Sequence, residues 1–291
     1  MAQIEPRPLI VCGMGRSGTR MCANILRNSS LVELQGELGG PAGTRLLAWL
    51  EAALAQRRIE DFDTRYDFVR RAFRLSAPGR PSDRPHAIWF GHKTPRHERH
   101  FRRYETLFDN PENRPVYVYC LRNPFDVWRS YQAMPWNKFR DVDTFLEAWL
   151  RSVAVYELIA ERAPDRVLVF NLDRMLRAAD WRDYLEPTLF QPLGLSGETF
   201  SRPVITLRNS NSSLNKTGAR PDPISEADRR AIARQPEVRR IAAEHFPWLG
   251  LPPPPPGLIR RDAKKSGRMA RLRRTAVRAW RQARREWNRP R

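Results

Sequence analysis

Cysteine is scarce in this sequence. The chain of 291 residues has three, Cys12, Cys22 and Cys120. An odd number of cysteines, spread over segments with the apolar pattern of buried elements, does not suit a disulfide framework. We therefore expect reduced thiols and a cytoplasmic protein, because disulfides persist mainly in oxidising compartments.

Long apolar runs and metal-binding spacings are also missing. No stretch approaches the roughly 20 apolar residues that a membrane-spanning helix needs. The first residues lack the apolar segment of a signal peptide. The 5 histidines do not cluster with the cysteines at spacings typical of zinc sites. These absences argue against an integral membrane protein, a secreted protein and a metalloenzyme.

Acidic residues are few relative to basic ones. The chain has 32 Asp and Glu against 52 Lys and Arg, and its net charge is +20. Residues 260–291 hold 14 Lys and Arg against Asp262 and Glu286, so this segment carries +12 and the remainder carries +8. Polyanionic substrates explain part of the charge of the remainder. The tail needs a separate explanation.

The apolar content of 41%, with 10% aromatic residues, is sufficient for a packed core. For this length we expect one large α/β domain with extensions. Short apolar runs that alternate with helical patterns favour a three-layer fold with a central parallel sheet and a ligand site at the carboxyl ends of the strands. The predicted domain covers residues 1–251, a proline-rich spacer covers 252–262, and a basic helical tail covers 263–291.

The stretch 9–26 is the first candidate site. Residues 9–12 have the pattern of a buried strand, glycines follow at 13, 15 and 18, and helical spacing of apolar residues begins at Thr19. A strand, a glycine-rich turn and a helix form a phosphate cradle, because backbone N–H groups point at the anion. Arg16, Ser17 and Thr19 add side-chain donors. The alternative is a tight turn with no ligand, and the lysine of ATP-binding P-loops is missing.

A second strand with a polar end follows at residues 115–121. It is rich in β-branched and aromatic residues. Arg122 comes directly after it, Asn123 is the expected helix cap, and Pro124 suits the first helical turn. Ser130 lies two turns further along this helix. The alternative is a capped helix that carries a solvated arginine.

Together these stretches resemble the sulfotransferases that use 3′-phosphoadenosine-5′-phosphosulfate (PAPS), a family with a P-loop-like α/β fold. Residues 16–19 are similar to its 5′-phosphosulfate loop, and Arg122 and Ser130 are similar to the pair that binds the 3′-phosphate. Arg20 departs from the Ser or Thr usual at that place. A late basic loop closes over the 3′-phosphate in many members, and residues 210–220 fit that role loosely. The resemblance implies that PAPS is bound by Gly15, Arg16, Ser17, Gly18, Thr19, Arg20, Arg122, Ser130, Lys216, Gly218 and Arg220.

The resemblance also implies catalytic groups. In members that use a glutamate, a Gly-Glu pair follows the loop and its carboxylate is the general base, and Glu37 is at the matching place. Glu33 is the reserve candidate. His92 is the alternative, because other members use a histidine. Lys93 resembles the catalytic lysine of the family, and we expect it to stabilise charge together with Arg16. This arrangement requires no metal.

Three further segments complete the expected domain. Residues 96–107 predict an arginine-rich helix, in which we expect the side chains of His97 and His100 to be solvated. Residues 142–162 have the pattern of a long amphipathic helix, and residues 166–170 that of another strand. The sequence Asn-Leu-Asp at 171–173 differs from the motif that the family usually has at this place, and we interpret the segment as architectural.

The tail has apolar residues at steps of three and four, with Arg and Lys on its other faces. This pattern predicts a basic amphipathic helix. We favour an anionic membrane surface as its partner, with the protein cytoplasmic and peripheral to the inner face of the membrane. Packing of the tail on the domain or on a second protomer is the second interpretation. Nucleic acid comes last, because no recognition fold accompanies the charge.

The sequence therefore predicts transfer of a sulfuryl group from PAPS to a hydroxyl acceptor by in-line displacement, with a carboxylate general base. Carbohydrate, lipid-linked glycan, small alcohol and peptide tyrosine stay open as acceptors, and so does a homodimer. One rival is an ATP-dependent kinase-like phosphotransferase, for which the P-loop lysine is missing. The other is a non-enzymatic scaffold that acts at a membrane surface through its basic tail.

Overall fold

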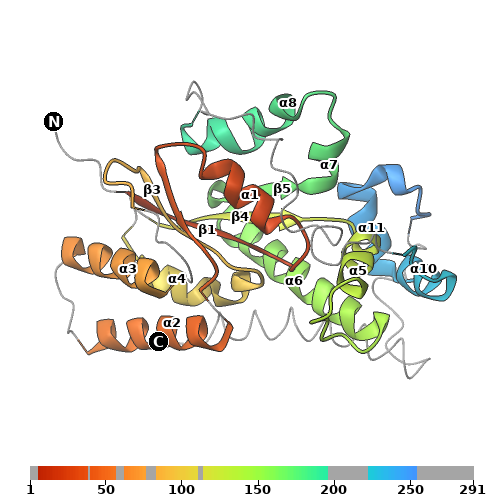
Figure 1. Ribbon diagram of the computed structural model, residues 1–291, viewed down its shortest axis with the longest axis horizontal. Helices are drawn as coiled ribbons and strands as arrows, with labels where there is room; N and C mark the ends of the chain where they lie inside the picture. Colours follow the sequence, from red (N-terminus) through yellow and green to blue (C-terminus); the bar gives the residue numbers. More distant parts are fainter. Residues whose placement is uncertain are drawn as a thin grey trace.

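A five-stranded parallel sheet forms the centre of the protein (Figure 1). The strand order is β2-β3-β1-β4-β5, and all neighbouring strands pair in parallel. The computed structural model describes residues 6–38, 40–56, 62–76, 83–110, 114–195 and 222–253. The strands are β1 (Arg7–Gly13), β2 (Val32–Gln35), β3 (Trp89–Lys93), β4 (Val116–Leu121) and β5 (Val167–Asn171).

Helices make up most of the rest of the described chain. Those ranges contain no helix that is both long enough and apolar enough to cross a bilayer. The α-helices are α1 (Thr19–Leu26), α2 (Gly40–Ala55), α3 (Phe62–Ser76), α4 (Phe101–Leu107), α5 (Pro124–Gln132), α6 (Val142–Arg162), α7 (Leu172–Arg177), α8 (Trp181–Leu185), α10 (Glu226–Ala233) and α11 (Pro236–His245). Shorter helical turns are η1 (His97–His100), η3 (Pro164–Arg166), η4 (Glu186–Phe190), η5 (Gln191–Leu193) and η7 (Pro247–Leu249).

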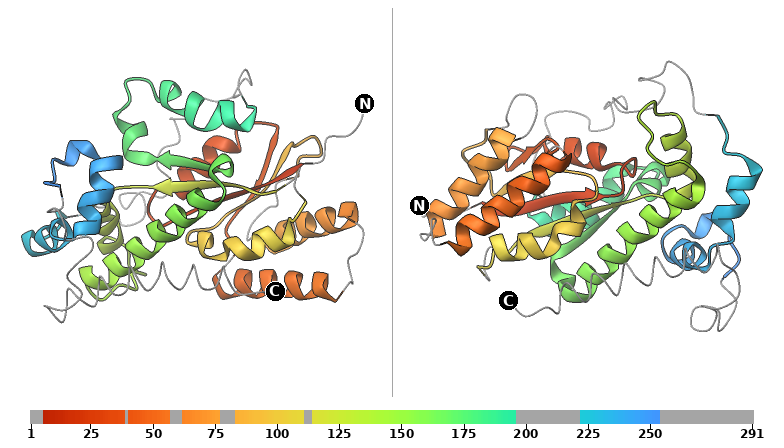
Figure 2. Two further views of the ribbon diagram at one scale, coloured as in Figure 1. Left: turned by 180° about the vertical axis from the view of Figure 1, so that it is seen from behind. Right: turned by 90° about the horizontal axis from the view of Figure 1, so that it is seen from below.

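Helices cover both faces of the sheet (Figures 1 and 2). Leu9 and Val11 of β1 belong to a core cluster with α1, α7 and α8, whereas Ile10 and Cys12 belong to one with α3, α4 and α6. This alternation follows from the two-residue period of a strand. Because both faces are buried, the central strands β1 and β4 appear in the sequence as nearly continuous apolar runs. The predicted three-layer α/β fold is confirmed, with α2 added outside the layer of α3 and α4 (Figure 1).

The position of β1 determines where a ligand can bind. From β1 the chain runs to β2 and β3 on one side of the sheet, and then crosses to β4 and β5 on the other side. The connections that follow the neighbouring strands β1 and β4 leave in opposite directions. In such sheets a crevice opens at this point, beyond the carboxyl ends of the strands. The residues that follow β1, β3 and β4 therefore meet at one edge of the sheet.

The local predictions are largely confirmed, with one exception. The observed α6 has the predicted bounds, and all three cysteines are buried and free. The prediction of one helix over residues 96–107 is wrong, because Arg96 has a φ of 64° and η1 precedes α4. Since η1 packs between β1 and α6, His97 is 1% exposed rather than solvated, and His100 is partly buried.

Several predictions fall on residues outside the described ranges. These are the basic loop with Lys216, Gly218 and Arg220, most of the spacer, and the tail at 263–291. Their roles in binding the 3′-phosphate and a membrane surface stay predictions. So do the domain boundaries and a homodimer.

Candidate functional site

The loop between β1 and α1 has the backbone of an anion-binding turn. Gly18 precedes α1 with a φ of 90°, and a Cβ at this position would lie 3.0 Å from the side chain of Leu172. Arg16 also has a positive φ, 69°, which is uncommon for a residue with a side chain and is concentrated at functional sites. The first turn of α1 presents unpaired N–H groups and the positive end of the helix dipole to this loop.

The polar side chains of the loop differ in their burial. Ser17 is 1% exposed, and its hydroxyl has no hydrogen-bond partner among the residues that the structure describes. Thr19 is also buried, whereas Arg20 is exposed. Gly15 lies directly beside the hydroxyl group of Tyr131. The loop therefore directs Ser17 into the protein and Arg20 to solvent, and their binding roles stay predictions.

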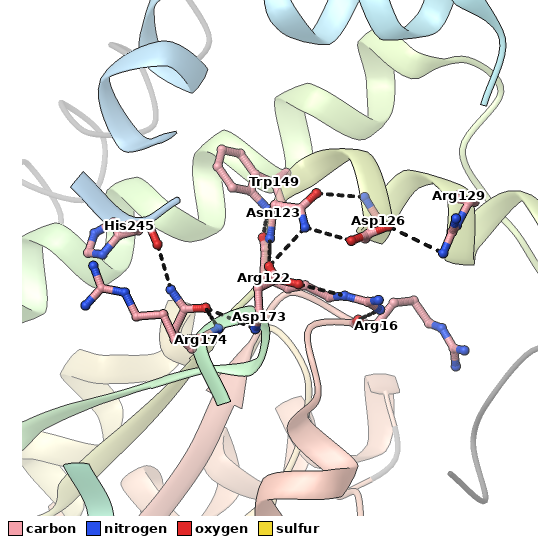
Figure 3. Close-up of polar contacts among 10 residues, drawn as sticks. Arg16, Arg122, Asn123, Asp126, Arg129, Trp149, Asp173, Arg174 and His245 are labelled. Atoms are coloured by element: carbon pink, nitrogen blue, oxygen red, sulfur yellow. Dashed lines mark hydrogen bonds and ion pairs between the residues drawn. The ribbon is translucent and has the colours of Figure 1, made fainter. Parts of the chain in front are cut away.

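The second predicted element lies against this loop (Figure 3). Arg16 Nε donates to Ser130 Oγ at 2.8 Å, and Arg122 Nη1 donates to the carbonyl oxygen of Arg16 at 3.3 Å. As predicted, Asn123 caps α5 and accepts from the backbone N–H of Asp126 at 2.9 Å. Burial lowers the pKa of Arg16, and the positive charge of Arg122 lowers it further. Two arginines that are far apart in the sequence thus lie in one region, and their positive charges there favour a bound anion.

Asp173, at the start of α7, holds the second element in place. Its carboxylate accepts from the backbone N–H and the side-chain amide of Asn123 at 2.7 and 3.0 Å, and lies 3.7 Å from Arg122 Nε (Figure 3). Burial raises the pKa of Asp173, although these neighbours oppose the shift. The sequence alone indicates only an architectural role for residues 171–173. An acidic residue two positions after the end of a strand is the signal in the sequence that points to this contact.

Lys93 and Glu37 form an ion pair at the carboxyl end of β3. The side chain of Lys93 is 7% exposed and that of Glu37 is 53% exposed, so a buried cation holds a carboxylate that is open to solvent. Burial lowers the pKa of Lys93, whereas the charge of Glu37 raises it. The backbone N–H of Thr94 donates to the carbonyl of Val11 at 3.0 Å, which ties this pair to the strand that precedes the loop.

The two alternative bases have different surroundings. Glu33 on β2 is 1% exposed and is held by two arginines of α3. His92 is fully buried, and burial lowers its pKa to about 3. Neither side chain is open to an acceptor that arrives from solvent, whereas Glu37 is. The geometry therefore favours Glu37 among the three candidates.

Two further contacts at the site, made by Glu98 and Trp136, do not follow from the sequence. The carboxylate of Glu98 in η1 accepts from the backbone N–H of Gly13 at 3.0 Å and from the hydroxyl of Ser152 at 2.6 Å, and so fixes the start of the loop. The guanidinium of Arg16 lies 5.9 Å from the ring of Trp136, which is 47% exposed. These contacts join residues that are distant in the chain, and local patterns do not report them.

Comparisons with models of protein families and with solved structures give the following matches. The model of the "Sulfotransferase family" matches residues 8–179. One similar solved structure is the sulfotransferase STF9 from Mycobacterium avium, with a TM-score of 0.43, 13% identity, and coverage of 87% of this chain and 79% of that chain. Another is the sulfotransferase domain of the olefin synthase from Synechococcus PCC 7002, with a TM-score of 0.43, 16% identity, and coverage of 95% and 97%.

The comparison with curated proteins gives no significant match. The family model nevertheless spans more than half of the chain. It includes both anion-binding elements and the pair of Glu37 and Lys93. The chain therefore belongs to the sulfotransferase family.

Proposed function

We propose that the protein transfers a sulfuryl group from PAPS to the hydroxyl group of an acceptor. The observation that carries this proposal is the contact of Arg16 with Ser130 and Arg122, which brings the two anion-binding elements together. A donor with phosphate groups at its 3′ and 5′ ends needs two such elements in one site. Membership of the sulfotransferase family supports the same chemistry.

The polar groups of the site suit a bisphosphorylated nucleotide. Ser17 Oγ and Arg122 Nε are buried and form no hydrogen bond within the described part of the chain, although Arg122 Nε lies 3.7 Å from the carboxylate of Asp173. Such groups are costly unless a ligand or water satisfies them. We assign Ser17 and the N–H groups of its loop to the 5′ end of PAPS, and Arg122 and Ser130 to the 3′-phosphate. Arg16 lies between these two sets of donors.

In the proposed reaction the acceptor oxygen attacks sulfur, and the bond between sulfur and the bridging phosphate oxygen breaks. The proton of the acceptor hydroxyl passes to Glu37, and the products are a sulfate ester and adenosine 3′,5′-bisphosphate. Glu37 suits the role of base because its carboxylate is exposed and held beside a cation. Lys93 and Arg16 stabilise the negative charge that develops on the leaving phosphate.

Calorimetry with adenosine 3′,5′-bisphosphate and adenosine 5′-phosphate tests the binding part of the proposal. We expect the wild type to prefer the bisphosphate, and Arg122→Ala to weaken its binding by about 10- to 100-fold, as expected for a hydrogen bond to a charged group. Arg129→Ala is the matched control, because Arg129 lies on α5, the helix that follows Arg122, is 46% exposed and pairs with Asp126 instead (Figure 3). A wild type that binds neither nucleotide would refute the proposal.

Transfer of radiolabelled sulfate from PAPS tests the chemical part. We expect label to move to one or more of a panel of carbohydrates, lipid-linked glycans, alcohols and tyrosine peptides. ATP with magnesium serves as the competing donor, and transfer of labelled phosphate instead of sulfate would favour a kinase-like activity. The acceptor that becomes labelled also defines the substrate class.

A further inference from the structure

Thr94 lies between the two candidate catalytic segments. It follows Lys93 in the chain, and its Oγ1 accepts a hydrogen bond from the backbone N–H of Leu38, the residue after Glu37, at 3.0 Å. Thr94 is 5% exposed and Leu38 is fully buried. One hydroxyl group therefore connects the backbone beside the exposed carboxylate to the strand end that carries the lysine.

A chain of buried hydrogen bonds continues from Thr94 into the core. His92 Nδ1 lies 2.9 Å from Thr94 Oγ1, and His92 Nε2 lies 2.8 Å from the hydroxyl oxygen of Tyr104. The same oxygen lies 2.7 Å from His97 Nδ1. The ring of Phe73 packs edge-on against His92 at a centroid distance of 5.0 Å. The position of Thr94 Oγ1 is thus fixed from the side that faces away from Glu37.

These interior groups are uncharged at neutral pH. Burial lowers the pKa of His92 to about 3, burial also lowers that of His97, and burial raises that of Tyr104 well above its usual value. A neutral imidazole has one donor and one acceptor nitrogen. The hydrogen bonds therefore run in one direction along the chain, and each group orients the next.

We propose that Thr94 is a positioning residue, which holds Glu37 beside Lys93 and is itself oriented by His92, Tyr104 and His97. The proposal rests on the proposed function, because it assigns a purpose to the pair in sulfuryl transfer. It also explains why a histidine next to the lysine is buried: His92 supports the base instead of serving as one.

The loop that carries Glu37 needs such support. Glu37 follows Gly36, whose backbone is the least restricted of any residue. Its side chain is 53% exposed, so packing restrains it little. Besides the ion pair with Lys93, the hydrogen bond at Leu38 constrains the backbone beside Glu37, and with it the direction of the carboxylate. A displacement of about 1 Å at a reacting group can cost about 100-fold in rate.

The test compares Thr94→Val, which keeps the shape of the side chain and removes the hydroxyl, with Thr94→Ser, which keeps the hydroxyl. We expect Thr94→Val to lower kcat by about 10- to 100-fold, to leave the affinity for adenosine 3′,5′-bisphosphate unchanged, and to be rescued in Thr94→Ser. Thr106→Val is the matched control, because the hydroxyl of Thr106 donates to Arg102 within its own helix at 3.0 Å. It should leave kcat unchanged.

A second readout does not depend on turnover. NMR of isotope-labelled lysine follows the titration of Lys93, whose neighbours include Glu37, Arg27 and Arg20. Glu37 raises the pKa of Lys93 and the two arginines lower it. Displacement of Glu37 in Thr94→Val should therefore move this titration to lower pH, and Thr94→Ser should restore it. Tyr104→Phe, which removes the hydroxyl that orients His92, should shift it in the same direction by a smaller amount.

The two proposals can fail separately. If the wild type shows no PAPS-dependent turnover but Lys93 still titrates at lower pH in Thr94→Val, the proposed function fails and the positioning of Glu37 stands. If the wild type is active and Thr94→Val keeps both its kcat and the titration of Lys93, Thr94 does not position Glu37. If Thr94→Val is misfolded, the titration of Lys93 in Tyr104→Phe provides the test. An unchanged titration of Lys93 in that variant would overturn the proposal.

Discussion

Strand β2 and the loop that follows it carry one glutamate each, in opposite environments. Glu33 is 1% exposed and is bound by Arg70 and Arg74, whose Nε atoms lie 2.8 and 2.6 Å from its carboxylate oxygens. Glu37 is 53% exposed and pairs with Lys93. Burial alone would raise the pKa of Glu33, but the hydrogen bonds from the two arginines lower it below its usual value.

The comparison shows how burial and partners separate a structural carboxylate from a reactive one. The lone pairs of Glu33 that accept hydrogen bonds from the arginines are unavailable to a substrate. Protonation of Glu33 would remove the buried counterion of Arg70 and of Arg74, and Arg74 would keep only the exposed Asp83. Glu37 has an open side, and its partner is a single lysine at the ligand edge of the sheet. We therefore expect Glu33 to contribute to stability and Glu37 to contribute to rate.

The largest effect is expected for Glu37→Gln. It removes the proposed base, so turnover should fall by about 100- to 10,000-fold. Binding of adenosine 3′,5′-bisphosphate should change little, and the free energy of unfolding should fall by less than in Glu33→Gln, because Glu37 is half exposed whereas Glu33 is buried. Sulfate-transfer kinetics and calorimetry measure the two quantities. Wild-type turnover in this variant would remove the distinction between the two glutamates.

Glu33→Gln should have the converse effect. Removal of one member of a buried ion pair costs about 3 to 5 kcal/mol, and we expect about 3 kcal/mol because both arginines keep an exposed edge. Urea unfolding measures this loss. Turnover per folded molecule should stay within about threefold of the wild type. The base is still present in this variant, so only small structural changes near the site affect the rate. A variant that is stable but inactive would assign the base to Glu33.

Acid titration of stability sharpens the comparison further. The folded pKa of Glu33 is lowered from its ordinary value of 4.5. Between these two values the unfolded chain binds more protons than the folded protein, so stability rises with pH. This contribution is complete above pH 4.5 and is lost as the pH falls through the folded pKa, with a slope of at most about 1.4 kcal/mol per pH unit. Glu33→Gln should lack this component of the unfolding curve, and Glu37→Gln should retain it.

The smallest effect is expected one residue away from the buried pair. Arg71 on α3 pairs with Asp67, and these side chains are 70% and 48% exposed. Solvent screens such a pair, so Arg71→Ala should cost less than about 0.5 kcal/mol. Arg70→Ala should cost several times more in the same unfolding assay. Equal losses would mean that the contacts of Glu33 contribute no more than a surface ion pair.

The sequence was sufficient for the features that neighbouring residues determine. The strand, glycine turn and helix at 9–26 and the cap formed by Asn123 before Pro124 depend on residues a few positions apart, and both are confirmed. The placement of Glu37 next to Lys93 could be expected only through the resemblance to a family. The geometry of this pair depends on the register of β2, β3 and β1, which the sequence does not specify.

Contacts across the chain were not predictable. Glu33 meets Arg74 across 41 positions, and Asp173 meets Asn123 across 50. Which acidic residue faces which basic one depends on helix packing, and many pairings satisfy the same composition. His97 was misassigned for a related reason, since a left-handed residue at Arg96 turns the chain and changes which side of the segment is buried.

The close approach of Gly15 to Tyr131 restricts the order in which mutations can accumulate. A methyl group on Gly15 would overlap the Tyr131 hydroxyl, and the tyrosine ring is enclosed by Phe139 and Trp136 at centroid distances of 4.9 and 6.1 Å. Gly15→Ala alone is therefore a poor first step. Tyr131→Phe removes the overlapping oxygen and leaves the methyl 3.3 Å from the ring carbon that carried it, a tight contact that a small shift of the ring relieves. We therefore expect positions 15 and 131 to be epistatic. A mutant library that varies residue 15 but keeps Tyr131 would not contain the double variant or the sequences that can be reached from it.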